Sequence, residues 1–547
     1  MSSEKAPLNA RHSPPERDQN LRILDGGHFD TLVIGAGING AVAAAALAGA
    51  GTRVAVVDKG DFAGGVSSSS SNLAWGGIKY LESGELRLVR KLCLSRNRLM
   101  DAYPSTVEEI RFFASIRRGF RMWSIFVWAG ALLYWLMGNC RMAPPRYLTP
   151  RQIQREAPVV APDEIVGGIE YSDCYLHDND SRFVFNFVRK AMDSGATAVN
   201  YLTIDAMTWD TDESLWRVAA TDNVSGRNLT IKANSIVNAT GPGADPLNAA
   251  VGIETEHHHV LSKGIHLIVD RVTDLHKVLT FFASDGRLFF VIPMGPKTCI
   301  GTTDTQVNDP AVGVTEADRD FVLANANAML RLPRPLTADD VIAERVGVRP
   351  LALAGARDQQ DWVQLSRKHE IEVDRGRRYL SIFGGKLTDC INVGDELVEV
   401  VEGLGIPTPS AGGRWYGEPA LERRAAFLAR AASMELDRLT PDDSPEPLSL
   451  RFWRRYGEAA FTLLDAIAED SSEAELILAA ADYTKAEIRL AAEREMIVEL
   501  KDFMRRRSKI EQVIRRQALV GDPGLVELGE RLFGSQSDTM LAAYFQA

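Results

Sequence analysis

The sequence predicts an α/β fold: a Rossmann-like domain that binds a dinucleotide, a substrate domain built on an antiparallel sheet, and a C-terminal all-helical domain. Three observations predict it. A glycine-rich turn stands between two apolar runs near the start of the chain, strand patterns dominate the middle, and helical periodicity dominates the C-terminal part. With 547 residues the chain is too long for one hydrophobic core, so several domains are expected.

The glycine-rich turn reads GAGING from Gly35 and runs into an alanine-rich helix. Gly35 permits a tight turn, Gly37 lets the backbone approach a pyrophosphate, and Gly40 allows close helix–strand packing. A second apolar run ends at Asp58, which can accept hydrogen bonds from a ribose hydroxyl pair. A glycine-rich turn in an ordinary α/β domain is the weaker interpretation. The predicted cofactor contacts are Gly35, Gly37, Asn39, Gly40 and Asp58.

Two features favour FAD as the dinucleotide. The fingerprint opens the folded chain, which is a frequent position for FAD-binding units. A serine run and a double glycine follow Asp58 after a short loop, over residues 67–77. Such a segment can lay hydroxyl and backbone N–H groups along an elongated cofactor, and its return to apolar residues argues against a flexible linker. The predicted contacts here are Ser67, Ser68, Ser71, Gly76 and Gly77.

Two later strand ends are expected to return the chain to the cofactor. One apolar strand closes on Ala239-Thr240-Gly241, beside which the adenosine half of a flavin cofactor commonly lies. Residues 379–393 read as a strand, a double-glycine turn and a helix start, an arrangement that aims backbone N–H groups at a ligand. The contacts expected from this second strand end are Gly385, Lys386, Leu387 and Thr388.

Composition limits the partners and the compartment. The net charge of −11 gives no indication of a nucleic-acid partner. The five cysteines are scattered, odd in number and without CxxC spacing, which fits a reducing compartment and predicts no metal site. Residues 1–29 are polar and rich in charge and proline, so a disordered leader without a secretory signal is expected.

Residues 122–138 form an uncharged, aromatic-rich segment with arginines on both sides. The preferred interpretation is a helix that dips into one leaflet of a membrane, because its tryptophans and tyrosine suit the interface. A buried core helix is the second interpretation, since this length is ambiguous. A transmembrane span is the least favoured, because it would separate the flanking domains.

The remaining patterns set the domain organisation. Residues 181–194 have helical periodicity, a strand hairpin turns at Ser225-Gly226, and residues 255–303 read as further strands. A glycine- and proline-rich linker spans residues 402–419, and residues 485–516 have helical periodicity. We expect a disordered leader over 1–29, a discontinuous FAD-binding and substrate region over 30–405, and a C-terminal helical domain over 406–547.

A series of motifs occurs in one order: IGAGINGA, the serine run with GGIKYLE, IEYSDC, VNATGP, SKGIH, VIP with IGTTD, GVRPL, IFGGKLT and EMIVELKDFMRRR. With these motifs the chain resembles the FAD-dependent, respiratory glycerol-3-phosphate dehydrogenases. The resemblance implies FAD as cofactor and oxidation of sn-glycerol 3-phosphate to dihydroxyacetone phosphate. It also implies electron transfer to a membrane quinone and a peripheral position on the cytoplasmic face of the inner (plasma) membrane.

The resemblance also implies site residues. Arg349 in GVRPL and Arg367 in LSRKH match the family's phosphate-binding arginines, and Lys386 in FGGKLT matches a lysine beside flavin and substrate. His266 in SKGIH matches the candidate base, and an imidazole suits proton removal near neutral pH. The implied catalytic residues are His266, Arg349 and Lys386.

Lys79 and Tyr80 match the family's substrate-facing pair, and Thr303 in IGTTD lies at a strand end near the site. The family usually has arginine where Lys79 stands, so the charge is kept and bidentate geometry is lost. Trp75 replaces a common histidine, and Asp389 adds a negative charge close to the expected phosphate. These departures leave the exact substrate open.

Several of these residues have structural interpretations as well. His266, flanked by apolar residues, also fits a satisfied core histidine. The run of three histidines at 257–259 reads as a solvated turn and less well as a metal site, because successive residues do not converge easily on one ion. The arginines at 505–507 read as a solvated face, with a membrane- or partner-facing patch as the second interpretation.

The leading hypothesis is a quinone-linked glycerol-3-phosphate dehydrogenase at a membrane surface. One alternative is an oxidase or dehydrogenase of another phosphorylated or hydroxylated small substrate. Another is a membrane-associated flavoprotein with a degraded site. The expected partners are sn-glycerol 3-phosphate or a similar small phosphorylated alcohol, a membrane quinone and a membrane surface, and a homodimer is left open.

Overall fold

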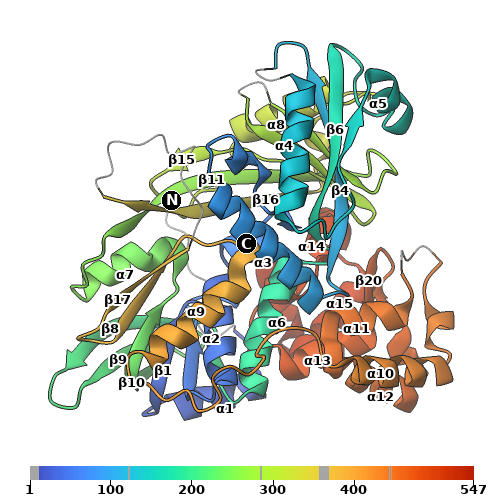
Figure 1. Cartoon of the computed structure of the whole chain (residues 1–547). Helices are drawn as coiled ribbons and strands as arrows, with labels where there is room; N and C mark the ends of the chain where they lie inside the picture. Colours follow the sequence, from blue (N-terminus) through green and yellow to red (C-terminus); the bar gives the residue numbers. More distant parts are fainter. Residues whose placement is uncertain are drawn as a thin grey trace.

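The computed structural model describes residues 11–120, 123–283, 286–355, 369–442, 444 and 446–546. Two large sheets lie one above the other in Figure 1, and the C-terminal helices lie beside them. The lower sheet carries the glycine-rich fingerprint, and the upper sheet carries the strands of the predicted substrate domain. The predicted fold class is confirmed.

The lower sheet forms around β1 (His28–Ile34), which lies parallel between β2 (Val54–Val57) and β10 (Asn228–Asn238). All four residues of β2 are buried, as expected for a parallel strand covered on both faces. The carboxyl ends of these strands meet at one edge, where the glycine-rich turn begins. The sheet continues through the parallel β7 (Thr197–Val199) on one side and, on the other, the parallel β18 (Tyr379–Phe383) and the antiparallel β17 (Glu370–Asp374).

β10 is one strand that forms two pairings. The sequence patterns predict its two halves as separate elements. Its first half forms the predicted hairpin with β9 (Leu215–Asp222), which pairs in turn with β8 (Leu202–Asp210). Its second half runs parallel to β1 and brings residues 239–241 to the glycine-rich turn. The hairpin and the return strand are both confirmed, as parts of one strand.

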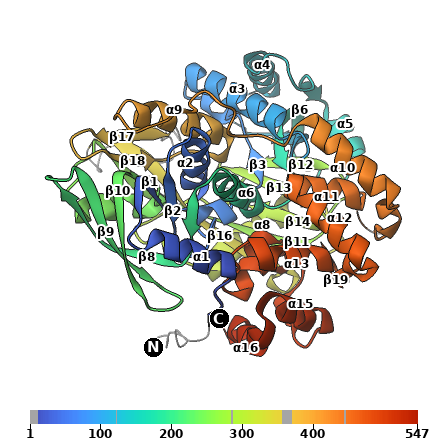
Figure 2. The same ribbon diagram turned by 90° about the horizontal axis from the view of Figure 1, so that it is seen from below.

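The fingerprint helix α2 (Ile38–Gly49) is buried along most of its length by its alanines. These small side chains let α6 (Asp180–Asp193) and α9 (Cys390–Glu402) pack closely against it, as Figure 2 shows from below. α6 confirms the predicted helix near residues 181–194, and β18 with α9 confirms the predicted strand, turn and helix start over 379–393.

The expected disordered leader is wrong for residues 15–24, which form helix α1 (Pro15–Leu24). Leu21 and Leu24, three residues apart, are buried against the lower sheet. Arg17 is fully buried, with its Nη2 2.5 Å from an Asp222 carboxylate oxygen and 2.7 Å from the Asn200 carbonyl oxygen. A buried ion pair and two leucines therefore order this helix. Residues 1–10 lie outside the described part of the chain.

The upper sheet is antiparallel apart from the parallel pair β12–β4. Its longest strand, β11 (His257–Asp270), pairs with β14 (Lys297–Gly301), β15 (Thr305–Val307) and β16 (Ala343–Ala354). The strands predicted over residues 255–303 are confirmed. The other members are β3 (Leu73–Ala74), β4 (Val107–Arg117), β5 (Arg146–Leu148), β6 (Ile165–Leu176), β12 (Lys277–Phe282) and β13 (Leu288–Met294).

Five further helices occupy the connections of the two sheets. They are α3 (Leu86–Ala102), α4 (Ser124–Met137), α5 (Pro150–Glu156), α7 (Ala244–Ala250) and α8 (Glu316–Met329). α4 lies within the apolar segment at 122–138. In the part of the chain that the structure describes, no helix combines the length and the hydropathy needed to cross a bilayer.

The C-terminal region is mainly helical, as predicted, and contains a two-stranded sheet in addition. The helical periodicity over residues 485–516 does not give one helix: α13 ends at Arg494, residues 495–499 are not helical, and a π-helical stretch (Asp502–Arg507) follows. The elements are α10 (Leu421–Ser433), α11 (Leu448–Tyr456), α12 (Ala460–Glu469), β19 (Leu476–Leu478), β20 (Ala481–Thr484), α13 (Lys485–Arg494), α14 (Ile510–Val513), α15 (Pro523–Phe533) and α16 (Ser537–Gln546).

The predicted linker at residues 402–419 packs against the lower domain. Trp415 is buried and lies over glycines of α2 and α9, where a Cβ on Gly394 would stand 2.2 Å from its ring. The backbone N–H of Ser410 donates to the Ala50 carbonyl at 2.8 Å. This stretch is therefore anchored along its length before α10 begins.

Candidate active site

The glycine-rich turn forms a cradle of bare backbone, and any side chain in place of its glycines would fill it. Gly35 has φ +93°, and a Cβ on it would stand 2.6 Å from the Ala239 carbonyl oxygen. A Cβ on Gly40 would stand 1.8 Å from the Gly35 carbonyl oxygen. The ends of β1 and β10 and the start of α2 therefore touch through bare backbone, which leaves room for a diphosphate at the helix N-terminus.

Asp58 is already engaged by the turn. Its carboxylate accepts hydrogen bonds from the N–H of Ala36 at 2.7 Å and of Gly60 at 2.9 Å. Burial raises the pKa of Asp58 to about 6, and the two backbone donors oppose that shift. The carboxylate thus fixes the fingerprint turn, and its predicted contact with a ribose stays a prediction.

The serine segment runs from the cradle to the upper sheet. The Ser67 hydroxyl accepts from the Ile38 N–H at 2.9 Å, at the first turn of α2. Ser68 donates to the Gly65 carbonyl, and Ser71 Oγ lies 2.9 Å from His266 Nε2. The segment therefore places hydroxyl groups at both the nucleotide cradle and the candidate base.

The double glycine after this segment is held by Asp173. The Gly76 N–H donates to the Asp173 carboxylate at 3.1 Å, and Arg96 and the Tyr134 hydroxyl bind the same carboxylate at 2.9 and 2.7 Å. Gly77 has φ +80°, which favours glycine. The Gly76 N–H that was expected to face the cofactor is thus used within the protein.

The second glycine turn meets the fingerprint helix. Gly384 and Gly385 have φ of +63° and +99°, and the Asn39 amide donates to the Gly384 carbonyl at 3.0 Å. Thr388 donates to the Trp75 carbonyl at 3.2 Å. The structure therefore brings three stretches of predicted cofactor residues together: the fingerprint, the serine segment and residues 384–388.

Lys386 and Tyr80 meet in the same region. The Lys386 Nζ lies 4.3 Å from the centroid of the Tyr80 ring, which is buried. Lys79, next to Tyr80, is half-buried. The ammonium and the aromatic face thus form a cation–π contact.

Arg349 lies on β16 opposite Ser262 of β11. Its guanidinium lies directly over Gly264, where a Cβ would stand 2.2 Å from Nη2. It donates to the Thr302 hydroxyl at 3.1 Å and lies 3.4 Å from the Asp304 carboxylate. The Thr303 hydroxyl accepts from the Ile265 N–H at 3.1 Å, so Thr303 supports the adjacent strand.

His266 lies on β11 between Gly301 of β14 and Arg345 of β16. Its Nδ1 is buried without a hydrogen-bond partner in the described part of the chain. Burial, with Arg345 and Arg349 nearby, holds the pKa of His266 well below 6.5. The imidazole is therefore neutral at physiological pH, and one ring nitrogen can accept a proton.

Arg345 was not predicted as a site residue. It is 1% exposed and donates to the Asp180 carboxylate at 2.9 Å, which also accepts from the Ser70 N–H at 2.8 Å. It stands on the same face of β16 as Arg349, since alternate strand residues share a face. Arg345 could have been predicted from its spacing, because two arginines four positions apart in one strand lie on the same face.

Other expectations need correction. Histidines 257–259 begin β11 and are not a solvated turn, and His257 Nδ1 lies 2.6 Å from a Glu372 carboxylate oxygen. The described part of the chain holds no group of three or more histidine, cysteine or acidic side chains that could bind a metal. Asp389 is paired with His369 at 2.7 Å, so its charge is balanced locally.

The arginines at 506 and 507 are buried and are neither a solvated face nor a membrane patch. Arg507 binds both carboxylate oxygens of Asp61 at 2.8 and 2.9 Å, and Arg506 binds one at 2.6 Å. They connect the C-terminal region to the loop after β2, next to the cofactor cradle. Arg367 lies outside the described residues.

A dinucleotide cradle beside a cationic, histidine-bearing antiparallel sheet defines a flavin-dependent oxidoreductase of two discontinuous domains. The family model described as FAD dependent oxidoreductase matches residues 30–365, and the model described as the C-terminal domain of alpha-glycerophosphate oxidase matches residues 412–538. The chain belongs to the family of FAD-dependent glycerol-3-phosphate dehydrogenases and oxidases.

Two curated relatives are each 30% identical to the chain. Glycerol-3-phosphate dehydrogenase 2 of Mycobacterium tuberculosis aligns over 91% of this chain and 83% of its own length. Aerobic glycerol-3-phosphate dehydrogenase of Bacillus subtilis aligns over 72% of this chain and 70% of its own length. The crystal structure of glycerol-3-phosphate dehydrogenase from Bacillus halodurans, complexed with FAD, is similar with a TM-score of 0.71 and 25% identity, over 98% of this chain and 97% of that one.

Proposed function

We propose that this protein oxidises sn-glycerol 3-phosphate to dihydroxyacetone phosphate and passes the electrons to a membrane quinone. The observation that carries the substrate is that His266 and Lys386 meet one segment, residues 71–80, and that Arg349 lies beside His266. His266 contacts Ser71, Lys386 contacts Tyr80, and the Arg349 guanidinium lies over Gly264, two residues before His266 on β11. The names of the relatives indicate the same substrate.

The residues present fit FAD. A diphosphate fits the bare cradle around Gly35 and Gly40, where a Cβ would clash with backbone, and Ser67 and Asn39 line its edge. When bound, FAD supplies an acceptor for the hydride that leaves C2 of the alcohol. Residues 384–388 and the serine segment would hold the cofactor between the two sheets.

The side chains then have separate tasks. The Arg349 guanidinium pairs with the substrate phosphate through charge-assisted hydrogen bonds. In the tautomer that donates Nε2–H to Ser71, His266 Nδ1 offers a free lone pair to the C2 hydroxyl proton. The Lys386 ammonium stabilises negative charge that develops between substrate and cofactor.

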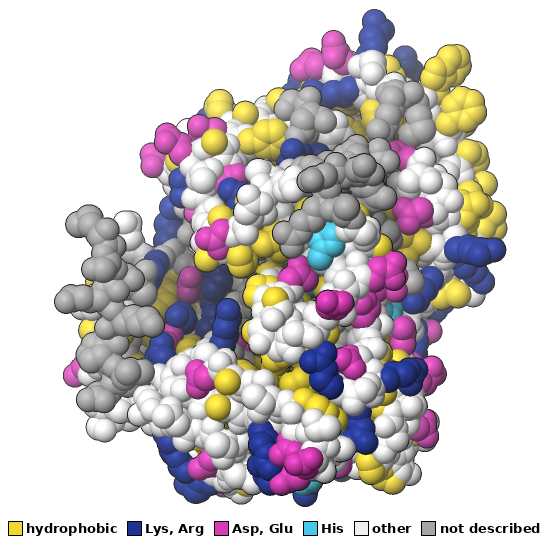
Figure 3. Space-filling view, turned by 90° about the vertical axis from the view of Figure 1, so that its left-hand side faces the viewer, with side chains coloured by type: hydrophobic (Ala, Val, Ile, Leu, Met, Phe, Trp, Pro, Cys, Tyr) yellow, Lys and Arg dark blue, Asp and Glu magenta, His cyan; other side chains and the backbone are white. Residues whose placement is uncertain are grey.

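We place the protein at the cytoplasmic face of the inner membrane, where it meets the quinone. An exposed apolar surface supports the contact with a membrane. Trp123 and Phe126, at the start of α4, are 78% and 66% exposed, and Leu136 at its end is exposed as well. Figure 3 shows hydrophobic side chains projecting along one upper edge of the molecule. Tyr134 on the buried side of α4 binds Asp173, which holds Gly76. α4 thus joins this surface to the active-site segment.

The proposal is tested with liposomes that contain a quinone. The holoenzyme should sediment with them, reduce the quinone with sn-glycerol 3-phosphate, and release little hydrogen peroxide. Phe126→Glu should weaken liposome binding by about tenfold or more, since burying a phenylalanine is worth about 1.5–3 kcal/mol. Leu421→Glu, at a leucine 73% exposed on α10, is the control and should bind normally. Peroxide release matching substrate oxidation would favour the oxidase alternative instead.

A further inference from the structure

Two arginines of β16 stand on one face of the upper sheet with a pair of glycines between them. Arg345 lies opposite His266 of β11. Two residues further along β16, Gly347 lies opposite Gly264. Residues two apart along a strand share a face, so these positions and Arg349 are on the same side of the sheet. The Arg349 guanidinium covers Gly264, whereas a different segment covers Gly347.

The serine segment is what lies over Gly347. A Cβ on this glycine would stand 3.3 Å from the Ser69 Cβ and 3.4 Å from the Ser69 carbonyl oxygen. The bare backbone therefore lets the segment pack closely against β16. Two residues later, Ser71 Oγ lies 2.9 Å from His266 Nε2. The contact between the serine and the candidate base thus depends on where this segment is held.

Arg345 and its carboxylate partner hold the segment on both sides of Ser71. The Arg345 Nη2 donates to the Asp180 carboxylate at 2.9 Å, and its Nη1 donates to the Asn72 side-chain oxygen at 3.3 Å. The same Asp180 oxygen accepts from the Ser70 N–H at 2.8 Å. Arg345 and Asp180 are both buried. The ion pair therefore fixes the residue before Ser71 and the residue after it.

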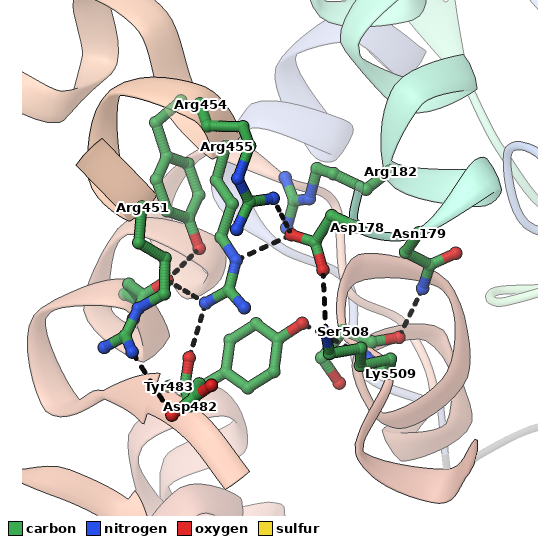
Figure 4. Close-up of polar contacts among 12 residues, drawn as sticks. Asp178, Asn179, Arg182, Arg451, Arg454, Arg455, Asp482, Tyr483, Ser508 and Lys509 are labelled. Atoms are coloured by element: carbon green, nitrogen blue, oxygen red, sulfur yellow. Dashed lines mark hydrogen bonds and ion pairs between the residues drawn. The ribbon is translucent and has the colours of Figure 1, made fainter. Parts of the chain in front are cut away.

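Asp180 itself starts from a fixed backbone. The two residues before it are bound to the C-terminal region, as Figure 4 shows. The Asp178 carboxylate lies 2.7 Å from the Arg455 Nε. The Asn179 amide donates to the Ser508 carbonyl at 2.6 Å. The C-terminal region thus supports the carboxylate that holds the serine segment.

We infer that Arg345 is a positioning residue for His266. Through Asp180 and Asn72 it fixes Ser71, which accepts the Nε2–H of the imidazole. The Nδ1, which has no hydrogen-bond partner among the described residues, is then the nitrogen left to take the substrate proton. The inference rests on the proposed function, in which His266 is the base. An arginine suits this task because its planar fork reaches Asp180 and Asn72 together, and a lysine ammonium offers no such fork.

The first test reads the tautomer of His266 by nitrogen NMR of holoenzyme labelled with [15N]histidine, without substrate. The signals are assigned by their loss in His266→Gln. We expect a proton on Nε2 and none on Nδ1 in the parent, and a mixture of the two tautomers in Arg345→Lys. A parent with its proton on Nδ1, or an Arg345→Lys holoenzyme with the parent tautomer, would overturn the inference.

The second test measures the rate of flavin reduction by saturating sn-glycerol 3-phosphate in a stopped-flow instrument. Arg345→Lys should lower this rate about tenfold, a part of the roughly 10²–10⁴-fold that a positioned base contributes. The substrate Kd should change by less than about twofold, since Arg349 is kept to bind the phosphate. A weakened Kd with an unchanged rate would contradict the inference.

Ser71→Ala should lower the rate as Arg345→Lys does, with normal flavin content. Because Arg345 acts through Ser71, the double variant should be within about twofold of the slower single variant. Losses that multiply in the double variant would show that the two residues act independently, and the inference would be wrong.

Arg451→Lys is the matched control. Arg451 is also 1% exposed and lies 3.3 Å from Asp482, within the C-terminal region (Figure 4). This variant should keep the parent tautomer and the parent rate. The same changes as in Arg345→Lys would point to general damage and overturn the inference. If sn-glycerol 3-phosphate does not reduce the parent flavin, the proposed function fails, and the tautomer measurement alone decides the role of Arg345.

Discussion

The Lys386 Nζ lies 4.3 Å from the centre of the Tyr80 ring, although the two residues are 306 positions apart in the chain. This contact joins the GGIKY segment to the FGGKLT turn. Tyr80→Leu should therefore lower kcat/KM for sn-glycerol 3-phosphate by about 3- to 30-fold, the worth of a partly desolvated cation–π contact. Tyr80→Phe retains the aromatic face and should stay close to the parent. Equal losses in the two variants would show that the hydroxyl, and not the ring, is what matters.

Buried histidines should make the protein less stable in acid. Burial lowers the pKa of His259 to about 4, against 6.5 in the unfolded chain. As the pH falls below 6.5, His259 binds a proton in the unfolded state and stays neutral in the native state. The free energy of unfolding therefore falls between about pH 6.5 and 4. Urea unfolding should show this loss, and His259→Gln should reduce it by up to about 3 kcal/mol. If His259→Gln shows the same pH dependence as the parent, His259 is not the source of the loss of stability in acid.

The Asp61–Arg507 pair should be needed to hold the loop beside the cofactor cradle. Asp61→Asn leaves the buried Arg507 without its carboxylate and Arg506 with Asp502 alone, so the free energy of unfolding should fall by about 3–5 kcal/mol. The affinity for FAD should fall as well. Asp465→Asn removes the partner of Arg430 in an exposed ion pair and should change stability by less than about 1 kcal/mol. Retained FAD affinity in Asp61→Asn would limit the pair to a purely structural role.

Local patterns were sufficient to predict the nucleotide domain. The turn from Gly35 to Gly40 and the apolar runs on either side encode their own geometry, because Gly35 and Gly40 each meet a backbone contact that no side chain allows. The strand that ends at Ala239 and the double-glycine turn at Gly385 could be predicted from the sequence in the same way. These features depend on residues close together in the sequence.

The missed features depend on partners far away in the sequence. Helix α1 is ordered by Arg17 reaching Asp222, and a polar leader gives no hint of that pairing. The burial of Arg506 and Arg507 depends on Asp61 of the lower domain, some 445 positions earlier in the chain. Arg345 was not predicted as a site residue, because its position opposite His266 depends on the register of β16 against β11.

The most direct test of the central claim is anaerobic reduction of the bound flavin by sn-glycerol 3-phosphate. The account predicts that the parent holoenzyme loses its yellow absorbance within the time of turnover. Arg349→Ala should keep its flavin and bleach at least tenfold more slowly, because the phosphate loses its charge-assisted partner. A flavin that stays oxidised with this substrate and bleaches with a non-phosphorylated alcohol, equally in both proteins, would contradict the account.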